Sequence, residues 1–406
     1  MNTTPNQITR FIAIDAHKHY LVIGGLNSHM EIVLPLCRVS IHRFPDWAHK
    51  NLLPSDAVVI ESTTNSWALY DTFHPLVASA VVANPYQVKL IAAARVKTDK
   101  HDVWSLARLL VADLIPEVWV PPVHVRELRA LVAHRRRLVQ SRTRARNRLQ
   151  SLLHRHNLSP PVSRPFAHKY LDWWLSLDLS PIEHIRIRSD LDTLVFAQTQ
   201  VTRLQEAILL VAIHDERALF LIQLPGVGLI TAITLLAAIG DEGRFPTAKH
   251  LVGYSGLGCR VHDSGLTHYS GRITKAGRRD IRAAMVEAAH TACRTHPHWK
   301  AELARLEPRL GKNKAIVAIA RKLLVAVWHV LNERCADRFA DPEMVARKLA
   351  QYAYTLGRDN RPDGQSVGEF VRQQLDCLDI GADLDAIQFG KRTLPMPPSS
   401  LAAADD

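Results

Sequence analysis

The sequence predicts an α/β domain at the N-terminus, a long basic helical arm, and a mostly α-helical domain toward the C-terminus. Three observations predict this fold class. Short runs rich in Ile, Val and Leu alternate with helix-like segments over the first 120 residues, as in a mixed sheet covered by helices. An arginine-rich segment with a seven-residue apolar repeat follows. Beyond residue 218 the apolar pattern is mostly helical.

Composition limits the class of protein. The chain has 406 residues, of which 47% are hydrophobic, so it can form two or three folded domains and is not a disordered or collagen-like chain. Its five cysteines contain no Cys-x-x-Cys pair, which excludes a disulfide scaffold and a zinc ribbon and indicates a reducing compartment. A formal net charge of +12 indicates a polyanionic partner, either nucleic acid or an anionic membrane surface.

One uncharged stretch, residues 218–240, is long enough to span a bilayer. Gln223 and the turn-forming residues 225–228 lie near its centre, where they would break a membrane helix. We therefore expect two short buried helices that meet at a tight turn, and no membrane partner. The polar residues 1–10 lack the apolar core of a signal peptide, so we expect a cytoplasmic protein.

The first domain, residues 1–120, shows a strand-rich beginning. Apolar runs at residues 11–16, 20–26 and 31–36 predict an antiparallel meander. Residues 57–60 and 80–83 predict strands buried on both faces. Helices are expected between these two strands, from Pro85 and from Asp99.

The arm is expected over residues 121–217. Ten arginines occur between residues 126 and 155 against one acid, Glu127, and include Arg135, Arg136, Arg142 and Arg146. Apolar residues recur every seven positions from Leu131 to Leu152 and again from Leu194 to Ile208. We expect an antiparallel coiled coil, within one chain or between chains, whose arginines contact DNA or RNA phosphates.

Four carboxylates form the first candidate site: Asp15, Glu61, Asp99 and Asp102. Asp15 closes the first strand, Glu61 follows the strand at 57–60, and Asp99 and Asp102 share a face of one helix. Carboxylates that converge from several elements can hold Mg²⁺, or Mn²⁺ in its place, for phosphoryl transfer. The alternative is that each acid caps a turn or a helix.

Two further candidates lie in the expected third domain, residues 218–340. Pro225, Gly226 and Gly228 form a turn between two apolar helices, as in a helix-hairpin-helix whose backbone N–H groups bind a DNA phosphate; the alternative is a plain helix connection. A Gly/Ser/Thr-rich loop is expected over residues 253–277. A serine in a basic loop can attack a phosphodiester if the developing charge is neutralised, although Ser and Gly also fill ordinary surface loops. This loop carries three serines and its main cations as follows: Ser255, Ser264, Ser270, Arg260, Arg272, Lys275, Arg278 and Arg279.

Residues 341–406 are expected to be a peripheral, partly disordered tail because they are polar and end in Pro-rich and acidic residues.

Several short motifs occur in order along the chain. They are Ile14-Asp15 with Lys18, Glu61-Ser62-Thr63, Asn84-Pro85, residues 97–102, residues 225–228, Gly240-Asp241, Arg244-Phe245, Gly256-Leu257, Ser264-Gly265, Ile273, Lys275, Gly277, Arg282 and residues 320–323. This ordered set resembles the DEDD-type insertion-sequence transposases, whose N-terminal domain is similar to the Holliday-junction resolvase RuvC.

The resemblance implies a transposase or recombinase. It implies an RNase H/RuvC-like mixed sheet that holds Mg²⁺ at the four acids, and Ser264 as a nucleophile that forms a covalent phosphoserine link to DNA. It also implies a structured guide RNA, element ends and target DNA as partners, association with the bacterial nucleoid, and an active site shared between subunits of a dimer or tetramer.

Two other functions stay open on the sequence alone. The same acids suit a metal-dependent junction endonuclease that uses water as the nucleophile. The basic arm alone suits a non-catalytic nucleic-acid-binding protein.

Overall fold

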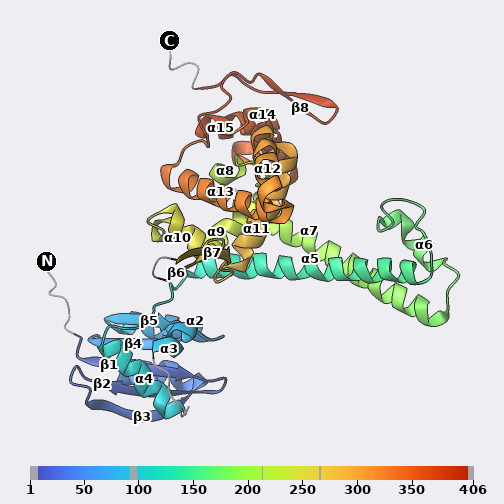
Figure 1. Cartoon of the computed structure of the whole chain (residues 1–406). Coiled ribbons are helices and arrows are strands. Elements are labelled where there is room, and N and C mark those ends of the chain that lie inside the picture. The colour runs from blue at the N-terminus through green and yellow to red at the C-terminus, as the bar shows by residue number, and fades with distance from the viewer. Residues whose placement is uncertain (1–7, 92–97, 213, 265–266, 401–406) are drawn as a thin grey trace. The chain divides into compact units, whose positions relative to one another are not determined.

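The computed structural model describes residues 8–91, 98–212, 214–264 and 267–400. The chain divides into two compact units, Met1–Pro122 and Val123–Asp406, and both are drawn in Figure 1. Each unit is described by itself.

The first unit contains a five-stranded mixed sheet with the strand order β3-β2-β1-β4-β5. Strands β1, β2 and β3 are antiparallel neighbours, whereas β4 and β5 run parallel to β1. The strands are β1 Arg10–Ala16, β2 Tyr20–Leu26, β3 Ile32–Ser40, β4 Asp56–Glu61 and β5 Ser79–Ala83. The helices are α1 Phe44–Asn51, α2 Ser66–Phe73, α3 Pro85–Ile91 and α4 Asp99–Val111. The prediction of a mixed α/β sheet with these strands is confirmed.

The two faces of this sheet are covered by different helices. Ile14 and Ile60 pack on one face with Phe44 of α1 and Phe73 of α2. On the opposite face, the side chains that pack together come from β1, β4 and α4, and they include Ala13, Val59, Val103, Leu106 and Ala107. Helix α4 therefore lies against the face opposite α1 and α2.

The second unit begins with the arm, in which α5 Val123–Arg155 packs against α7 Pro181–Ala212. Arg148 pairs with Asp190 and Arg142 with Gln198, so the two helices are antiparallel and belong to one chain (Figure 1). Short helix α6 Leu171–Leu175 lies in the connection, where Trp174 is fully buried in the apolar core of the distal arm. Trp174 therefore has a packing role in the arm.

The rest of the second unit is a mostly helical body. Its helices are α8 Arg217–Ile222, α9 Leu229–Ile239, α10 Ala248–Ser255, α11 Arg279–Thr295, α12 Pro297–Leu310, α13 Lys312–Glu333, α14 Pro342–Leu356 and α15 Val367–Cys377. Two antiparallel pairs complete it: β6 Cys259–Ser264 with β7 Thr267–Ile273, and β8 Ala386–Phe389 with β9 Arg392–Pro395. The uncharged stretch 218–240 forms the two short helices α8 and α9, as expected.

Helix α13 is long and apolar enough to cross a membrane by length and composition, but half of its most apolar window is buried within the structure. Its residues Ile319, Leu323 and Val327 are fully buried in the apolar core of the second unit. Packing in this core explains its hydrophobic pattern.

Two expectations about the second unit are corrected. The predicted loop at 253–277 is for the most part the end of α10 and the hairpin β6–β7, because Cys259, Val261 and Ile273 alternate with polar residues in a strand pattern. Residues 341–400 do not form a peripheral tail. Leu349 of α14 and Phe370 of α15 are buried in the same core as α13, because the polar residues occupy only one side of each helix.

Candidate active site and nucleic-acid interface

The strand register brings two of the predicted acids side by side. Ile14 of β1 is the parallel partner of Ile60 of β4, so Asp15 and Glu61 are the next residues on neighbouring strands. Side chains alternate between the faces of a strand. Because Ile14 and Ile60 face α1 and α2, Asp15 and Glu61 lie on the α4 face.

The other two acids are in the first turn of α4. Thr98 caps this helix, and its side chain accepts a hydrogen bond from the His101 backbone N–H. Asp99 and Asp102 follow in the first turn, where the helix dipole favours negative charge. The cap is therefore Thr98, and the alternative in which Asp99 is the N-cap is wrong. All four acids are on the same side of the sheet.

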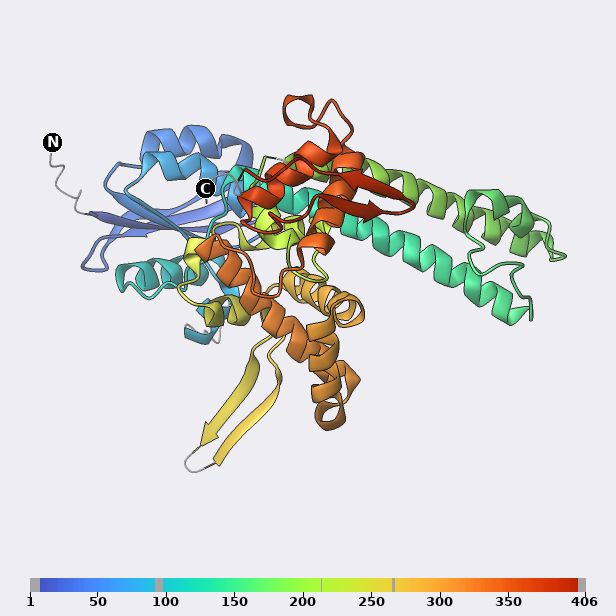
Figure 2. The same ribbon diagram turned by 90° about the horizontal axis from the view of Figure 1, so that it is seen from above.

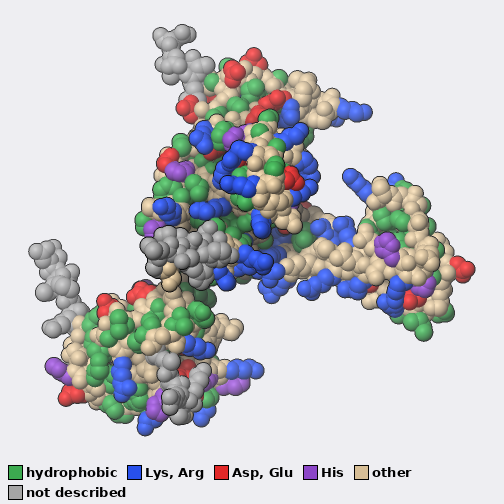
Figure 3. Space-filling view, viewed as in Figure 1, with side chains coloured by type: hydrophobic (Ala, Val, Ile, Leu, Met, Phe, Trp, Pro, Cys, Tyr) green, Lys and Arg blue, Asp and Glu red, His purple; other side chains and the backbone are tan. Residues whose placement is uncertain are grey.

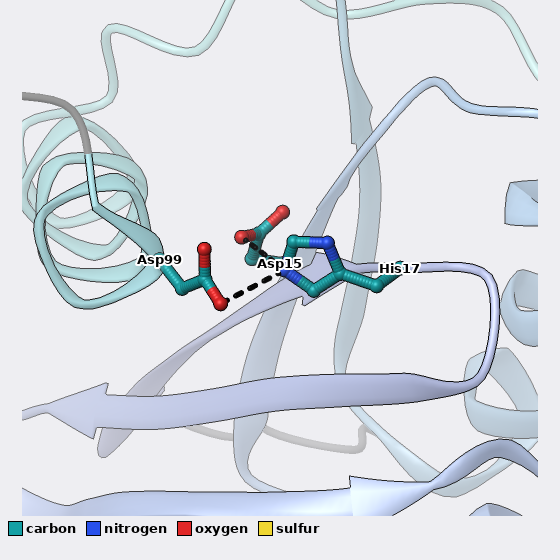
Figure 4. Close-up of side chains that lie close together, drawn as sticks. All are labelled: Asp15, His17 and Asp99. Carbon is teal, nitrogen blue, oxygen red and sulfur yellow. Dashed lines mark ion pairs between the residues drawn. The ribbon is translucent and has the colours of Figure 1, made fainter.

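His17 lies between two of these carboxylates (Figure 4). Its Nε2 is 3.1 Å from Asp15 Oδ2 and 3.3 Å from Asp99 Oδ2, yet this buried nitrogen has no hydrogen bond of acceptable geometry. The Tyr20 hydroxyl donates to Asp99 Oδ2 at 3.3 Å, and its ring lies 4.5 Å from the His17 ring. His17 and Tyr20 thus join the β1–β2 turn to the start of α4.

The donor set fits a divalent metal ion. Asp15, His17 and Asp99 each offer a ligand atom, and these three atoms lie within 4.8 Å of one another. Glu61 and Asp102, the other two predicted ligands, are not part of this group. Burial raises the pKa of the Asp15 carboxyl, His17 opposes this effect, and repulsion from Asp102 and Asp99 raises the pKa further. A bound cation would relieve this repulsion, and carboxylate oxygens are the ligands that Mg²⁺ prefers.

Ser264 lies in the second unit, whereas the four acids lie in the first. It is the exposed last residue of β6 and pairs with Thr267 of β7. Figure 2 shows this hairpin projecting from the helical body. The flanking cations Arg260, Arg272 and Lys275 are also exposed.

The other two serines differ from Ser264. Ser255 is fully buried, donates from Oγ to the Val252 carbonyl at 2.7 Å and accepts from the Leu257 N–H at 3.2 Å, which is a structural role. Ser270 is in β7, but its side chain lies outside the described part of the structure, as do Lys97 and Gly265.

The two glycines of the turn 225–228 differ: Gly226 is closely packed, and Gly228 faces open space. Pro225 is buried and so shapes the turn without reaching a ligand. Gly226 has a φ of +78°, and a Cβ there would lie 2.0 Å from the Ala288 carbonyl oxygen, so close packing on α11 requires glycine. Gly228 is exposed, and a Cβ there would meet nothing within 4 Å. Gly228 therefore leaves the start of α9 open.

The arm arginines differ in how their charge is compensated. Arg148 forms an ion pair with Asp190 at 2.5 Å, but the Nε atoms of Arg135, Arg142 and Arg146 are buried with no hydrogen-bond partner. Burial and repulsion from Arg142 lower the pKa of Arg135, and attraction to Glu287 opposes these effects. Burial and repulsion from Arg146 lower the pKa of Arg142. Lys and Arg side chains gather along the arm in Figure 3. This row is under-neutralised and suited to an anion.

Arg135 and Arg136 also line a cavity of about 560 Å³ between the arm and the body of the second unit. Arg278 and Arg279, at the start of α11, line the same cavity. Arg129 and Arg137 also line the cavity, as do two acids, Asp280 and Glu287. Asp280 forms an ion pair with Arg278, and the arginines outnumber the acids.

Sequence reasoning missed two residues. His17 follows Asp15 by two positions in the β1–β2 turn, and this Asp-x-His spacing was the available signal. Lys348 of α14 donates to carbonyl oxygens around the turn 225–228. No local pattern could have indicated that contact, because Lys348 is distant in sequence from the turn.

The chain is similar to known transposases and gene-inverting proteins. Residues 12–158 match a family model for DEDD transposases of the IS110 type, and residues 218–304 match the family described as Transposase IS116/IS110/IS902. The chain is 30% identical over 268 residues to the pilin gene-inverting protein of Moraxella lacunata, covering 62% of this chain and 72% of the relative. It is 29% identical over 291 residues to the pilin gene-inverting protein of Moraxella bovis, covering 68% and 80%. It is 26% identical over 285 residues to the transposase for insertion sequence element IS1111A of Coxiella burnetii, covering 68% and 78%.

A mixed α/β domain with clustered acids and these matches define a DNA transposase/recombinase. The chain belongs to the IS116/IS110/IS902 family of insertion-sequence transposases, and it is of the DEDD type.

Proposed function

We propose that this transposase cleaves and exchanges DNA strands with Mg²⁺ held by Asp15, Glu61, Asp99 and Asp102, and with Ser264 as the nucleophile. The observation that carries the proposal is the placement of all four acids on the α4 face of the sheet. The strand order β3-β2-β1-β4-β5 supports an RNase H/RuvC-like fold for the first unit.

Mg²⁺, when bound, would neutralise the developing charge on the scissile phosphate. The chain's own residues have separate parts in this scheme. The acids hold the cation and place the phosphate, and His17 with Tyr20 keeps Asp15 and Asp99 in position. Ser264 Oγ forms a bond to phosphorus while the bond to the leaving deoxyribose oxygen breaks. The serine proton ends on the released strand hydroxyl, and the other strand end stays joined to the protein.

The test is a covalent adduct with labelled element-end DNA in Mg²⁺, detected on a denaturing gel. Wild-type protein is expected to form the adduct, Ser264→Ala is expected to form none, and Ser270→Ala in the neighbouring strand serves as the matched control. A Ser264→Ala protein that recombines DNA at the wild-type rate excludes Ser264 as the nucleophile.

The same experiment separates the competing functions. A water-using endonuclease predicts cleavage that survives Ser264→Ala but not Asp15→Asn. A non-catalytic nucleic-acid-binding protein predicts no metal-dependent cleavage by any variant.

We further propose that α8, the turn 225–228 and α9 form a helix-hairpin-helix that binds a DNA phosphate. Within the described residues, the backbone N–H groups of Gly228, Leu229 and Ile230 have no hydrogen-bond acceptor. These groups begin α9, where the helix dipole favours an anion. Gly228→Asp tests this contact. Asp is a good N-cap and has room here, so the variant should fold while its carboxylate repels phosphate.

The under-neutralised arginine row, Arg135, Arg142 and Arg146, supports a nucleic-acid ligand on the arm, and we propose a structured guide RNA as that ligand. Purification of the protein from its host followed by sequencing of bound RNA tests this. Recovery of one discrete structured transcript is expected. Recovery of bulk cellular RNA alone contradicts guidance.

We propose that the active site is shared between subunits of a dimer or tetramer, and that the enzyme acts on nucleoid DNA in the cytoplasm. The resemblance of the ordered motifs to the DEDD-type transposases supports a shared site. A mixture of inactive Asp15→Asn and Ser264→Ala proteins should regain strand cleavage if the site is shared. No recovery in verified mixed oligomers argues against sharing.

A further inference from the structure

Lys348 of α14 is half-buried, contacts the turn 225–228 and lines a cavity together with Gly228 and Leu229. Its Nζ donates to the carbonyl oxygens of Ile222 at 2.7 Å, Leu224 at 2.9 Å and Val227 at 3.0 Å. One ammonium thus satisfies carbonyls at the end of α8, directly before the turn and within the turn. An ammonium has three N–H donors, and all three are used here.

Other contacts fix the same turn. Gly226 packs on the α11 backbone. The fully buried Gln223 donates to the Cys335 carbonyl at 3.1 Å and accepts from the Asp337 N–H at 2.7 Å. The inner carbonyls are therefore engaged by the protein, whereas Gly228 and Leu229 line an open cavity of about 530 Å³ opposite Arg347 and Gln351.

We propose that Lys348 is a positioning residue for DNA binding: its charged side chain holds the turn so that the N–H groups at the start of α9 face a DNA phosphate. This inference rests on the proposed helix-hairpin-helix contact. It assigns to α14 a part in nucleic-acid binding, because Lys348 belongs to this helix.

The charge state of Lys348 makes the proposal testable. Burial lowers the pKa of Lys348 to about 8, and attraction to Asp341 opposes this effect. The other titratable neighbours are Arg347 and Tyr352, on the same helix, while the α8–α9 turn and residues 388–390 contribute none. Above this pKa a neutral amine keeps two N–H donors for three carbonyls, so the hold on the turn weakens.

Fold stability and DNA binding should respond to pH in opposite directions. The unfolded chain, whose lysine keeps an ordinary pKa, binds more protons than the folded chain above pH 8, so this group increases the free energy of unfolding as pH rises. If DNA affinity falls over the same pH range, unfolding caused by the titration of Lys348 is therefore not the reason.

The experiment measures the dissociation constant of the full chain for a 20-base-pair duplex by fluorescence anisotropy, against salt and pH. We expect Lys348→Met to weaken binding about tenfold and to reduce the slope of log affinity against log salt by about one, as for one lost phosphate contact. Lys300→Met, which removes an exposed lysine of α12, is the matched control and should keep the wild-type slope.

In the wild type, affinity should fall between pH 7.5 and 9, and it should fall much less in Gly228→Asp, which has already lost the contact. A folded Lys348→Met protein with wild-type affinity and slope overturns the proposal, and so does a pH response that is equal in wild type and Gly228→Asp. If Lys348→Met does not fold, the pH comparison decides alone. If Gly228→Asp binds DNA like wild type, the proposed contact between the hairpin and DNA is excluded. If Gly228→Asp binds more weakly but Lys348→Met binds like wild type, the hairpin contact is supported and the role of Lys348 is excluded.

Discussion

Asp15 and Asp99 face each other across one imidazole nitrogen, His17 Nε2, at 3.1 Å and 3.3 Å. Asp15 is the penultimate residue of the central strand β1, and Asp99 is the first residue of α4. In the absence of metal, His17 is the group placed to reduce their mutual repulsion. This relationship gives the first two predictions.

Replacement of His17 by Ala should destabilise the metal-free protein, because His17 lowers the pKa of Asp15 and offsets the repulsion between the carboxylates. In the proposed function the four acids, and not His17, hold the ion, so Mg²⁺ should then stabilise His17→Ala more than wild type, by about 1 kcal/mol at saturating metal. Thermal unfolding with EDTA and with Mg²⁺ measures both effects. His19→Ala, at an exposed neighbouring position, is the control; an equal Mg²⁺ response in all three proteins contradicts the prediction.

Asp15→Asn should abolish cleavage yet stabilise the metal-free fold. The pKa of Asp15 is raised in the folded protein, so the free energy of unfolding decreases as pH rises through that pKa, and the neutral amide removes this loss at pH 7. We expect a cleavage rate at least about 100-fold lower with a higher unfolding midpoint in EDTA. A lower midpoint at pH 7 would show that the charged carboxylate stabilises the fold.

Gly226→Ala and Gly228→Ala should differ in stability. At Gly226 the added Cβ meets the Ala288 carbonyl oxygen and the backbone has a positive φ, so we expect a loss of about 2 kcal/mol or more. At Gly228 the space is open, and the change should stay within about 0.5 kcal/mol. Urea denaturation measures both variants, and similar losses would contradict the packing described for the turn.

Arg142→Met should weaken binding of RNA or duplex DNA and reduce the salt slope by about one. It should leave the free energy of unfolding unchanged or raise it, because a partly buried cation repelled by Arg146 is removed. Arg148→Met is the matched control on the same helix: Asp190 already neutralises Arg148. Equal losses of affinity in the two variants would show that only total charge matters.

The first unit could be predicted in detail from the sequence because its signals are local. Short apolar runs predicted β1 to β5. Asp15 and Glu61 lie near the ends of their strands, and Asp99 and Asp102 lie in the first turn of a helix, so their positions in the sequence indicated that each pair lies together. His17 was missed because its role depends on the β1–β2 turn folding back toward α4.

The second unit was harder because its contacts join distant segments. The loop expected around Ser264 is a hairpin, since strand pairing supplies the hydrogen bonds that its glycines and serines do not predict. Residues 341–400 are polar on average, but they form amphipathic helices whose apolar sides complete the core. Lys348, on one of them, could be recognised only from its three carbonyl partners.

The burial of α14 and α15 bears on how such mobile elements decay. A stop codon after residue 340 would leave the four candidate acids, Ser264 and all ten arginines of residues 126–155 in the product. The shortened product would nevertheless expose a large apolar surface and lose the ammonium beneath the α8–α9 turn. Genomic copies that are cut short at this point are therefore expected to be inactive, even though their motifs look intact.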